Sequence, residues 1–175
     1  MSTVAEQLKP FVLDVPDFPK PGIIFKDITP LLAEPSAWRQ TIETMSAELS
    51  QYKPDLLLAI ESRGFIFGAA LALEMDIGVH IARKPGKLPR ATKEVTYQLE
   101  YGQDRLEMHD DLLKFGRRVA IVDDVLATGG TAVAACELVE SLGGEVVCCS
   151  VFIELEDLGG RAKLGTRPIA SVLRY

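Results

Sequence analysis

Hydrophobic positions along the chain form either short continuous runs or repeats with helical spacing. Apolar runs predict strands at 55–60, 79–82, 119–122, 145–153 and 169–173. Helical spacing predicts helices over 36–51 and 64–75, and a further helix follows Thr131. Because strands alternate with helices, the pattern indicates an α/β protein with a central, mainly parallel sheet flanked by helices on both faces.

Two stretches interrupt this alternation. Residues 15–35 hold five of the ten prolines, which excludes a long helix and favours a stiff, extended segment after a short helix begun at Thr3 and Glu6. Residues 95–108 alternate apolar and polar side chains around a turn, which predicts an inserted β-hairpin. We therefore expect one domain, 1–175, with an N-terminal helix and covering segment (the hood) at 1–35 and a basic, flexible loop and hairpin at 83–109.

Composition narrows the class of protein. The chain has 175 residues, a net charge of −6 and 47% hydrophobic residues, so we expect no nucleic-acid partner. It has neither a membrane-length apolar run nor a signal-peptide pattern, which predicts a cytoplasmic protein without a membrane partner. The three cysteines, Cys136, Cys148 and Cys149, lie in segments predicted to be buried, which is typical of small core residues.

The most informative motif is Arg-Val-Ala-Ile-Val-Asp-Asp-Val-Leu-Ala-Thr-Gly-Gly-Thr at 118–131. It predicts a buried strand ending on Asp123 and Asp124, then a turn of small residues in which backbone N–H groups converge before a helix. The spacing matches neither a Walker A loop nor a dinucleotide fingerprint. It indicates a pocket for a phosphate ester with hydroxyl groups nearby, although an ordinary strand-to-helix turn with a solvated acidic pair has the same composition.

Two further turns belong to the same edge of the predicted sheet. Glu61 to Gly64 follow one strand, and Arg83 to Lys93 carry five basic residues and no acidic one. Ligands of open α/β sheets bind beyond the carboxyl ends of the strands, where these turns meet. The combination of an anion-binding turn, two carboxylates, an arginine and several lysines suits a sugar that carries two separate phosphate groups.

Five segments, in order, resemble the type I phosphoribosyltransferase family and, within it, the members that use adenine. They are Phe18-Pro19-Lys20-Pro21-Gly22-Ile23-Ile24-Phe25-Lys26-Asp27-Ile28, Glu61-Ser62-Arg63-Gly64-Phe65, Arg83-Lys84-Pro85-Gly86-Lys87-Leu88-Pro89, Leu99-Glu100-Tyr101-Gly102 and the 118–131 motif. The resemblance implies a purine-salvage glycosyltransferase that converts adenine and phosphoribosyl diphosphate (PRPP) into AMP and diphosphate. It also implies Mg²⁺ as cofactor and a homodimer.

The same resemblance implies a role for each matching residue. PRPP binding is implied for Ser62, Arg63, Arg83, Lys84, Lys87, Asp123, Asp124, Ala127, Thr128, Gly129, Gly130 and Thr131. Of these, Asp123 and Asp124 would hold the ribose hydroxyls directly or through Mg²⁺, and residues 127–131 the 5′-phosphate. Base binding is implied for Phe25, by stacking, and for the backbone of Ile24 and Lys26. Catalysis is implied for Arg63, Lys87 and Glu100, with Tyr101 shielding the site, and a non-proline cis peptide is expected at Glu61-Ser62.

Two alternatives remain open at the level of sequence. The first is a phosphoribosyltransferase for another purine base, since chemistry alone does not fix the acceptor. The second is a non-catalytic PRPP sensor, although such regulators normally carry an added DNA-binding domain for which an acidic chain of 175 residues has no room.

Overall fold

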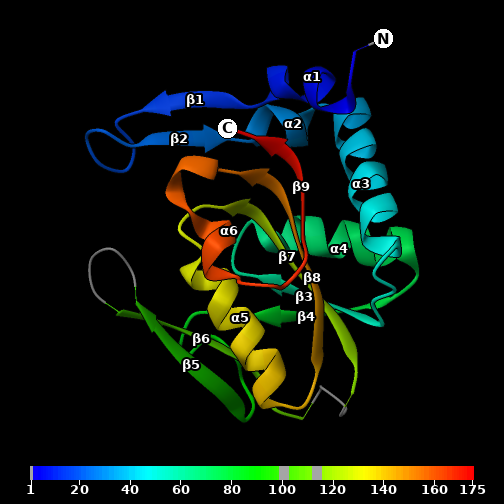
Figure 1. The fold of residues 1–175 in the computed structure, drawn as a ribbon, viewed down its shortest axis with the longest axis vertical. Helices are drawn as coiled ribbons and strands as arrows, with labels where there is room; N and C mark the ends of the chain where they lie inside the picture. Colours follow the sequence, from blue (N-terminus) through cyan, green and yellow to red (C-terminus); the bar gives the residue numbers. More distant parts are fainter. Residues whose placement is uncertain (1, 99–102, 112–115) are drawn as a thin grey trace.

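A five-stranded parallel sheet forms the centre of the protein. The structure is a computed structural model that describes residues 2–98, 103–111 and 116–175 (Figure 1). The strands have the spatial order β4-β3-β7-β8-β9. Their bounds are β3 (Leu56–Ile60), β4 (Gly78–Ala82), β7 (Arg118–Leu126), β8 (Glu145–Glu154) and β9 (Ile169–Arg174). Every residue of β3 is buried, as expected for a central strand covered on both faces.

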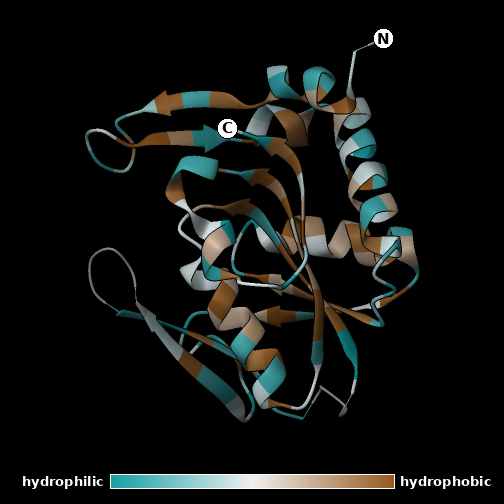
Figure 2. Ribbon diagram, viewed as in Figure 1, coloured by the Kyte–Doolittle hydropathy of each residue, from teal (hydrophilic) through white to brown (hydrophobic). Residues whose placement is uncertain are grey.

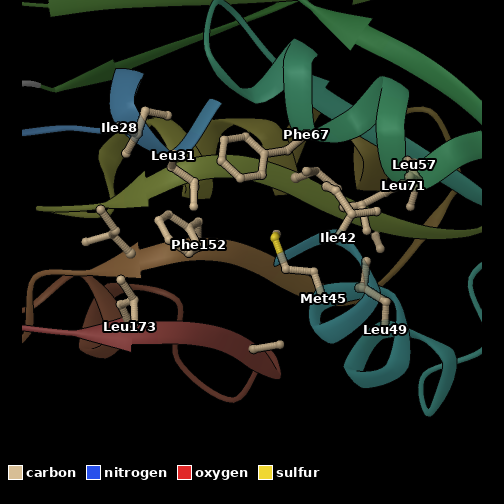
Figure 3. Packing of buried hydrophobic residues seen from close by; sticks show 14 of the residues in the cluster. Ile28, Leu31, Ile42, Met45, Leu49, Leu57, Phe67, Leu71, Phe152 and Leu173 are labelled. Carbon is tan, nitrogen blue, oxygen red and sulfur yellow. The ribbon is translucent and has the colours of Figure 1, made fainter. Parts of the chain in front are cut away.

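Helices cover both faces of this sheet. Helices α3 (Pro35–Ser50) and α4 (Gly64–Met75) lie over one face, and α5 (Gly130–Ser141) over the other. Figure 3 shows Phe67 of α4 beside Phe152 of β8, with ring centroids 5.9 Å apart. The outward face of α3 is mainly hydrophilic, whereas the strands of the central sheet are mainly hydrophobic (Figure 2). The two faces of the sheet thus hold two separate hydrophobic clusters.

The N-terminal segment forms a hood at one end of the sheet (Figure 1). It contains α1 (Val4–Leu8), the 3-10 helix η1 (Lys9–Phe11), the antiparallel pair β1 (Leu13–Pro16) and β2 (Ile24–Asp27), and α2 (Thr29–Ala33). Thr3 Oγ1 accepts from the Glu6 backbone at 3.2 Å and the Glu6 carboxylate accepts from the Thr3 backbone at 2.7 Å, which confirms the predicted capping box. The short helix α2 was not predicted; Pro30 is compatible with it because it occupies the first turn.

A second antiparallel pair, β5 (Thr92–Gln98) and β6 (Gln103–His109), forms the predicted hairpin. Its buried side chains Tyr97, Leu106 and Met108 pack in one cluster with α5. After β8 the chain forms the 3-10 helix η2 (Glu156–Leu158) and the short helix α6 (Gly160–Lys163). In the part of the chain that the structure describes, no helix is both long enough and apolar enough to cross a membrane.

The predicted fold class is confirmed, with one informative difference in β7. The sequence predicted an apolar strand at 119–122 that ends on Asp123 and Asp124, but the pairing of β7 with β8 continues past them as Val125↔Ile153 and Leu126↔Glu154. The acidic pair therefore lies within the strand, because β8 is long enough to extend the ladder past it. Cys136, Cys148 and Cys149 are buried free thiols, as predicted.

Candidate active site

A cavity of about 840 Å³ lies beyond the carboxyl ends of β3, β4, β7 and β8, beside residues 22–26 of the hood. The residues that line it are Gly22, Ile23, Ile24, Phe25, Lys26, Glu61, Ser62, Arg63, Lys84, Asp123, Asp124, Val125, Ala127, Thr131, Leu155, Asp157, Leu158 and Tyr175. The turns after β3, β4 and β7 therefore converge with the hood, as the position rule for parallel sheets predicts. The cavity has the size of a small-molecule site.

Two adjacent carboxylates, Asp123 and Asp124 in the last half of β7, line the wall of the cavity. Burial raises the pKa of Asp123 well above its usual value, and the neighbouring Asp124 carboxylate raises it further. Burial also raises the pKa of Asp124, which the Arg63 guanidinium opposes from 2.7 Å. Asp124 Oδ2 is buried and accepts no hydrogen bond from the described residues despite this ion pair. The site thus holds concentrated acceptor capacity that a ligand rich in hydroxyl groups can use.

Arg63 connects this pair to the hood. It precedes α4, and its guanidinium carbon lies 4.7 Å from the centroid of the Phe25 ring in β2. The same side chain forms the ion pair with Asp124 through Nε. One arginine therefore touches both the acidic strand end and the aromatic ring, so a ligand that bridges these two places must contact Arg63.

The turn after β7 forms an anion-binding loop. Gly129 has φ of +82° and precedes α5, which begins at Gly130. A smaller cavity of about 90 Å³ lies beside residues 126–132 and is also lined by Ser150, whose buried hydroxyl has no partner among the described residues. Backbone N–H groups at the start of a helix bind phosphate without a charged side chain. The geometry of this loop matches that use.

Glu61 organises the basic residues after β4. Its carboxylate accepts from the Arg83 guanidinium at 3.0 Å and from the Lys84 backbone N–H at 2.8 Å. The Arg83 hydrogen bond is the largest cause that lowers the pKa of Glu61. Lys84 Nζ forms an ion pair with Asp104 on β6. The peptide Glu61-Ser62 is cis, as the family resemblance implied.

The hood places aromatic and basic side chains over the cavity. The rings of Phe25 and Phe18 meet edge to face at 5.2 Å. Lys26 Nζ lies 2.6 Å from an Asp14 carboxylate oxygen and 3.8 Å from the centroid of the Tyr175 ring. Tyr175 follows β9, so these contacts join the hood to the far edge of the central sheet.

The structure brings most predicted site residues onto one wall. Those lining the large cavity are Ile24, Phe25, Lys26, Ser62, Arg63, Lys84, Asp123, Asp124, Ala127 and Thr131. Thr128, Gly129 and Gly130 line the small cavity instead. Arg83 and Lys87 line neither cavity; Arg83 binds Glu61, and its Nη1 donates to the Lys87 carbonyl at 3.2 Å. Glu100 and Tyr101 lie outside the described residues.

Sequence reasoning missed one part of the wall: Leu155, Asp157, Leu158 and Tyr175. The first three follow β8, the neighbour of β7 in the sheet. The rule that ligands bind beyond the carboxyl ends of parallel strands could have identified this turn from the predicted strand at 145–153. Tyr175 gave no local signal, since its place on the wall depends on tertiary packing.

The acidic pair supplies few metal ligands of its own. Among the described residues no group of three histidine, cysteine or acidic side chains could enclose a metal ion. Two carboxylates, one with an oxygen that accepts no hydrogen bond, nevertheless offer the hard oxygen ligands that Mg²⁺ prefers. The donor set therefore fits a Mg²⁺ ion that takes its remaining ligands from outside the protein.

The family comparison agrees with this geometry. A model of the phosphoribosyl transferase domain matches residues 31–164, which include the Glu61 turn, the basic segment and the anion-binding loop. The chain belongs to the phosphoribosyltransferase family.

Comparison with individual proteins narrows the family. A protein of Geotalea daltonii named adenine phosphoribosyltransferase is 49% identical over 170 residues, covering 97% of this chain and 99% of the relative. One of the same name from Carboxydothermus hydrogenoformans is 51% identical over 168 residues, covering 96% and 99%. Within its family, the chain belongs to the adenine phosphoribosyltransferases.

Solved structures extend the match to the whole fold. Adenine phosphoribosyltransferase from Thermoanaerobacter pseudethanolicus has a TM-score of 0.96 and 48% identity, covering 99% of this chain and 100% of that one. The Saccharomyces cerevisiae enzyme, solved with an imino-altritol bisphosphate and adenine, has a TM-score of 0.93 and 38% identity, with coverage of 99% and 100%. The hood, most of which precedes the matched residues 31–164, is thus part of the shared fold.

Proposed function

We propose that the protein transfers the phosphoribosyl group of PRPP to adenine, giving AMP and diphosphate, and that residues 1–175 act as one phosphoribosyltransferase domain. The observation that carries this proposal is the continuous cavity whose wall includes Phe25, Arg63, Asp124 and Thr131. An aromatic ring, a cation, a carboxylate pair and an anion-binding loop are the contacts that a base, a diphosphate, a ribose and a phosphate need in turn. The yeast relative solved with a bisphosphate and adenine supports the same assignment.

The 5′-phosphate binds residues 127–131. The backbone N–H groups of Thr128 to Gly130 and the start of α5 donate to its oxygens, with the Thr131 hydroxyl beside them. The Tyr97 hydroxyl lies 3.4 Å from Thr131 Oγ1, so the β5–β6 hairpin contacts this end of the site. A phosphate group can thus be held here although the protein carries net negative charge.

The ribose hydroxyls bind Asp123 and Asp124, directly or through Mg²⁺. Hydroxyl donors stabilise the charged carboxylates and oppose the rise in pKa that burial causes in the free protein. When bound with PRPP, Mg²⁺ neutralises charge that develops on the diphosphate. The two aspartates are the residues of this chain that would hold it.

The diphosphate binds the turn after β3 and the basic segment after β4. The residues proposed for it are Ser62, Arg63, Arg83, Lys84 and Lys87. Arg63 and Lys84 line the cavity, whereas the Arg83 guanidinium binds Glu61 and fixes the direction in which the basic segment leaves β4. Lys87 is proposed from its place in the sequence motif, because its side chain lies off the wall of the cavity.

The purine base binds under the hood. The Phe25 ring stacks on the base, and the backbone of Ile24 and Lys26 reads its edge through hydrogen bonds. Ile24 is 56% exposed in the free protein, so base binding removes apolar surface from water. Backbone groups of a paired strand are fixed in direction, which favours one hydrogen-bonding pattern over another.

Catalysis comes mainly from position and charge. A purine nitrogen attacks the anomeric carbon, the ribose gains oxocarbenium character, and negative charge grows on the leaving diphosphate, where Arg63 and Lys87 stabilise it. Glu100 is proposed to take part in proton transfer to or from the base. Tyr101 is proposed to shield the site from water, which would otherwise hydrolyse PRPP. The substitution Glu100→Gln should lower kcat, and an unchanged kcat and pH profile would remove this role.

The protein also carries an apolar surface suited to a second copy of itself. Ile66 and Leu73 lie seven residues apart on α4, and Val79 and Ile81 lie two apart on the edge strand β4; Leu73 is 86% exposed. We define these four residues as the α4–β4 face. The α4–β4 face is followed in the chain by the basic segment that begins at Arg83. The same face on a second copy of the protein can pack against it around a twofold axis. A homodimer formed there would place basic segments of both copies beside the sites.

Light scattering tests this dimer. The wild-type protein should have twice the mass of the chain, and Leu73→Glu should halve it because a charge would enter the apolar interface. A matched change on α3, Gln40→Glu, should leave the mass unchanged, and a wild-type monomer would refute the dimer.

The three free buried thiols support a cytoplasmic location, because a reducing compartment keeps cysteines in this form.

Diphosphate release tests the proposed function most directly. The protein, PRPP and Mg²⁺ are incubated in turn with adenine, hypoxanthine, guanine, xanthine and orotate. We expect release with adenine, with AMP as the second product. Release with another purine only would support the alternative acceptor, and no release with any base would support a PRPP sensor.

A further inference from the structure

The segment after β8 touches both ends of the proposed site. Residues 155–161, which we call the bridging segment, include η2 and the start of α6. Leu155, Asp157 and Leu158 line the large cavity near the hood. Two residues later, Gly160 packs against the anion-binding loop. A shift of this one segment would therefore change the base end and the phosphate end together.

The contact with the anion-binding loop is backbone against backbone. A Cβ atom at Gly160 would lie 2.2 Å from the Ala127 carbonyl oxygen, and one at Gly129 would lie 2.7 Å from the Gly160 carbonyl oxygen. Real Cβ atoms do not approach so closely, so both positions require glycine. Since neither side has a flexible side chain to absorb movement, the place of Gly160 sets the place of the loop.

An ion pair joins the start of α6 to the end of β8, in addition to the burial of Leu164 at the end of α6. Arg161 Nε donates to Glu154 Oε1 at 2.6 Å, and Arg161 Nη2 donates to Glu154 Oε2. The Glu154 side chain is 3% exposed and also accepts from the Ser171 hydroxyl at 2.8 Å. The Arg161 hydrogen bonds are the largest cause that lowers the pKa of Glu154. A buried carboxylate bound by a two-pronged guanidinium is a geometrically specific contact.

The start of the bridging segment is held separately. The Leu155 backbone N–H donates to the Leu126 carbonyl at 2.9 Å, and that of Glu156 donates to the Tyr175 carbonyl at 2.8 Å. Within the segment, the Leu158 N–H donates to the Leu155 carbonyl and the Gly159 N–H to the Glu156 carbonyl, both at 3.1 Å. These backbone bonds shape the turn, and the Arg161 contact ties its second half to β8.

We propose that Arg161 and Glu154 are a positioning pair. The pair fixes the position of the anion-binding loop through Gly160, and it fixes the position of Leu158 in the cavity wall at the base end. The proposal rests on the proposed function, because it assigns these two places to the 5′-phosphate and the base. Arg161 and Glu154 touch no reacting atom. Their effect on the reaction passes through Gly160 and Leu158, so binding of PRPP and of adenine should depend on the same pair.

Substitution of Arg161 should therefore weaken the binding of both substrates. Arg161→Ala should raise the KM for PRPP and the KM for adenine by about tenfold each, because it leaves the buried Glu154 carboxylate without its main partner. Arg161→Lys keeps the charge but not the two-pronged geometry, so it should restore part of both losses. A role in stability alone would lower the melting temperature without this paired change in KM.

Arg167 provides a matched control. Its guanidinium binds Glu140 in the same two-pronged way, with distances of 2.9 Å and 3.0 Å, but this pair joins the turn before β9 to the last turns of α5. Neither residue lines the cavity. Arg167→Ala should change both KM values less than twofold, and because the Glu140 side chain is 43% exposed it should lower the melting temperature less than Arg161→Ala does.

The experiment measures steady-state kinetics for wild type, Arg161→Ala, Arg161→Lys and Arg167→Ala, together with ribose 5-phosphate binding by calorimetry. Raised KM values for both substrates with weaker ribose 5-phosphate binding, in the Arg161 variants only, support the pair. The proposal is overturned if Arg161→Ala keeps both KM values and this affinity within twofold of wild type, or if Arg167→Ala changes them equally. If wild type releases no diphosphate with any base, the proposed function fails, and the calorimetry still decides whether Arg161 positions the loop.

Discussion

The proposed phosphate end and the proposed base end of the site are built in opposite ways. At the phosphate end, Asp124 is 5% exposed and sits in a central strand that the hydrophobic clusters cover on both sides. At the base end, Ile24 is 56% exposed and lies in a two-stranded sheet outside the central one. One end is thus part of the folded core, and the other is an addition that depends on side-chain contacts for its place.

This difference separates what each end contributes. Buried polar groups at a strand end are held in direction by the whole sheet, which suits a ligand whose reacting carbon must be placed accurately. An exposed two-stranded sheet is marginally stable by itself and gains stability from what it covers. We therefore expect substitutions at the phosphate end to remove activity, and substitutions at the base end to weaken the binding of adenine alone.

The largest effect should follow removal of both carboxylate charges. Asp123→Asn combined with Asp124→Asn should lower kcat/KM by about a thousandfold or more, because the ribose and its Mg²⁺ lose their main charged partners. Circular dichroism should show an unchanged fold, since asparagine has nearly the same shape. Near-normal turnover would remove the proposed role of the pair.

A smaller and selective effect should follow loss of the stacking ring. Phe25→Ala should raise the KM for adenine by about tenfold or more while the KM for PRPP stays within about threefold, because stacking acts on the base alone. Phe18, whose ring meets Phe25 at 5.2 Å but which does not line the cavity, gives the control: Phe18→Ala should have a much weaker effect. Equal changes in both KM values would show that the two ends are not separable.

The same contrast explains how far the sequence could predict the site. The phosphate end is contiguous, so the strand, the acidic pair and the glycines of 118–131 indicated their chemistry without tertiary knowledge. Phe25 alone carries no such signal, since most phenylalanines are core residues, and only the family resemblance gave it a role. Leu158 follows a predicted strand and could have been found by the rule for strand ends, whereas Tyr175 was missed because its neighbours in the cavity are distant in sequence.

Burial of the acidic pair should also cost stability in the free protein. Because the folded protein raises the pKa of Asp123, the neutral form favours folding, and stability is lost as pH rises through that raised pKa. Asp123→Asn should therefore increase the free energy of unfolding at pH 7, because a neutral amide avoids the cost of holding a charged carboxylate in this buried position. The gain over wild type should shrink as pH falls towards the usual carboxylate range. Chemical denaturation at several pH values measures it, and a less stable variant at pH 7 would contradict the argument.

The smallest effect should come from Tyr175, which joins the hood to the central sheet. Lys26 Nζ lies 3.8 Å from its ring centroid, and such a contact contributes about 0.5–1 kcal/mol at partly exposed positions. Tyr175→Leu should therefore raise the KM for adenine by about threefold and leave that for PRPP unchanged, because the Lys26 backbone loses part of its support. Tyr175→Phe keeps the ring and should behave as wild type, which separates the ring from the hydroxyl. If Tyr175→Leu instead changed the two KM values equally, the hood would be coupled to the phosphate end as strongly as to the base, and the division between the two ends would fail.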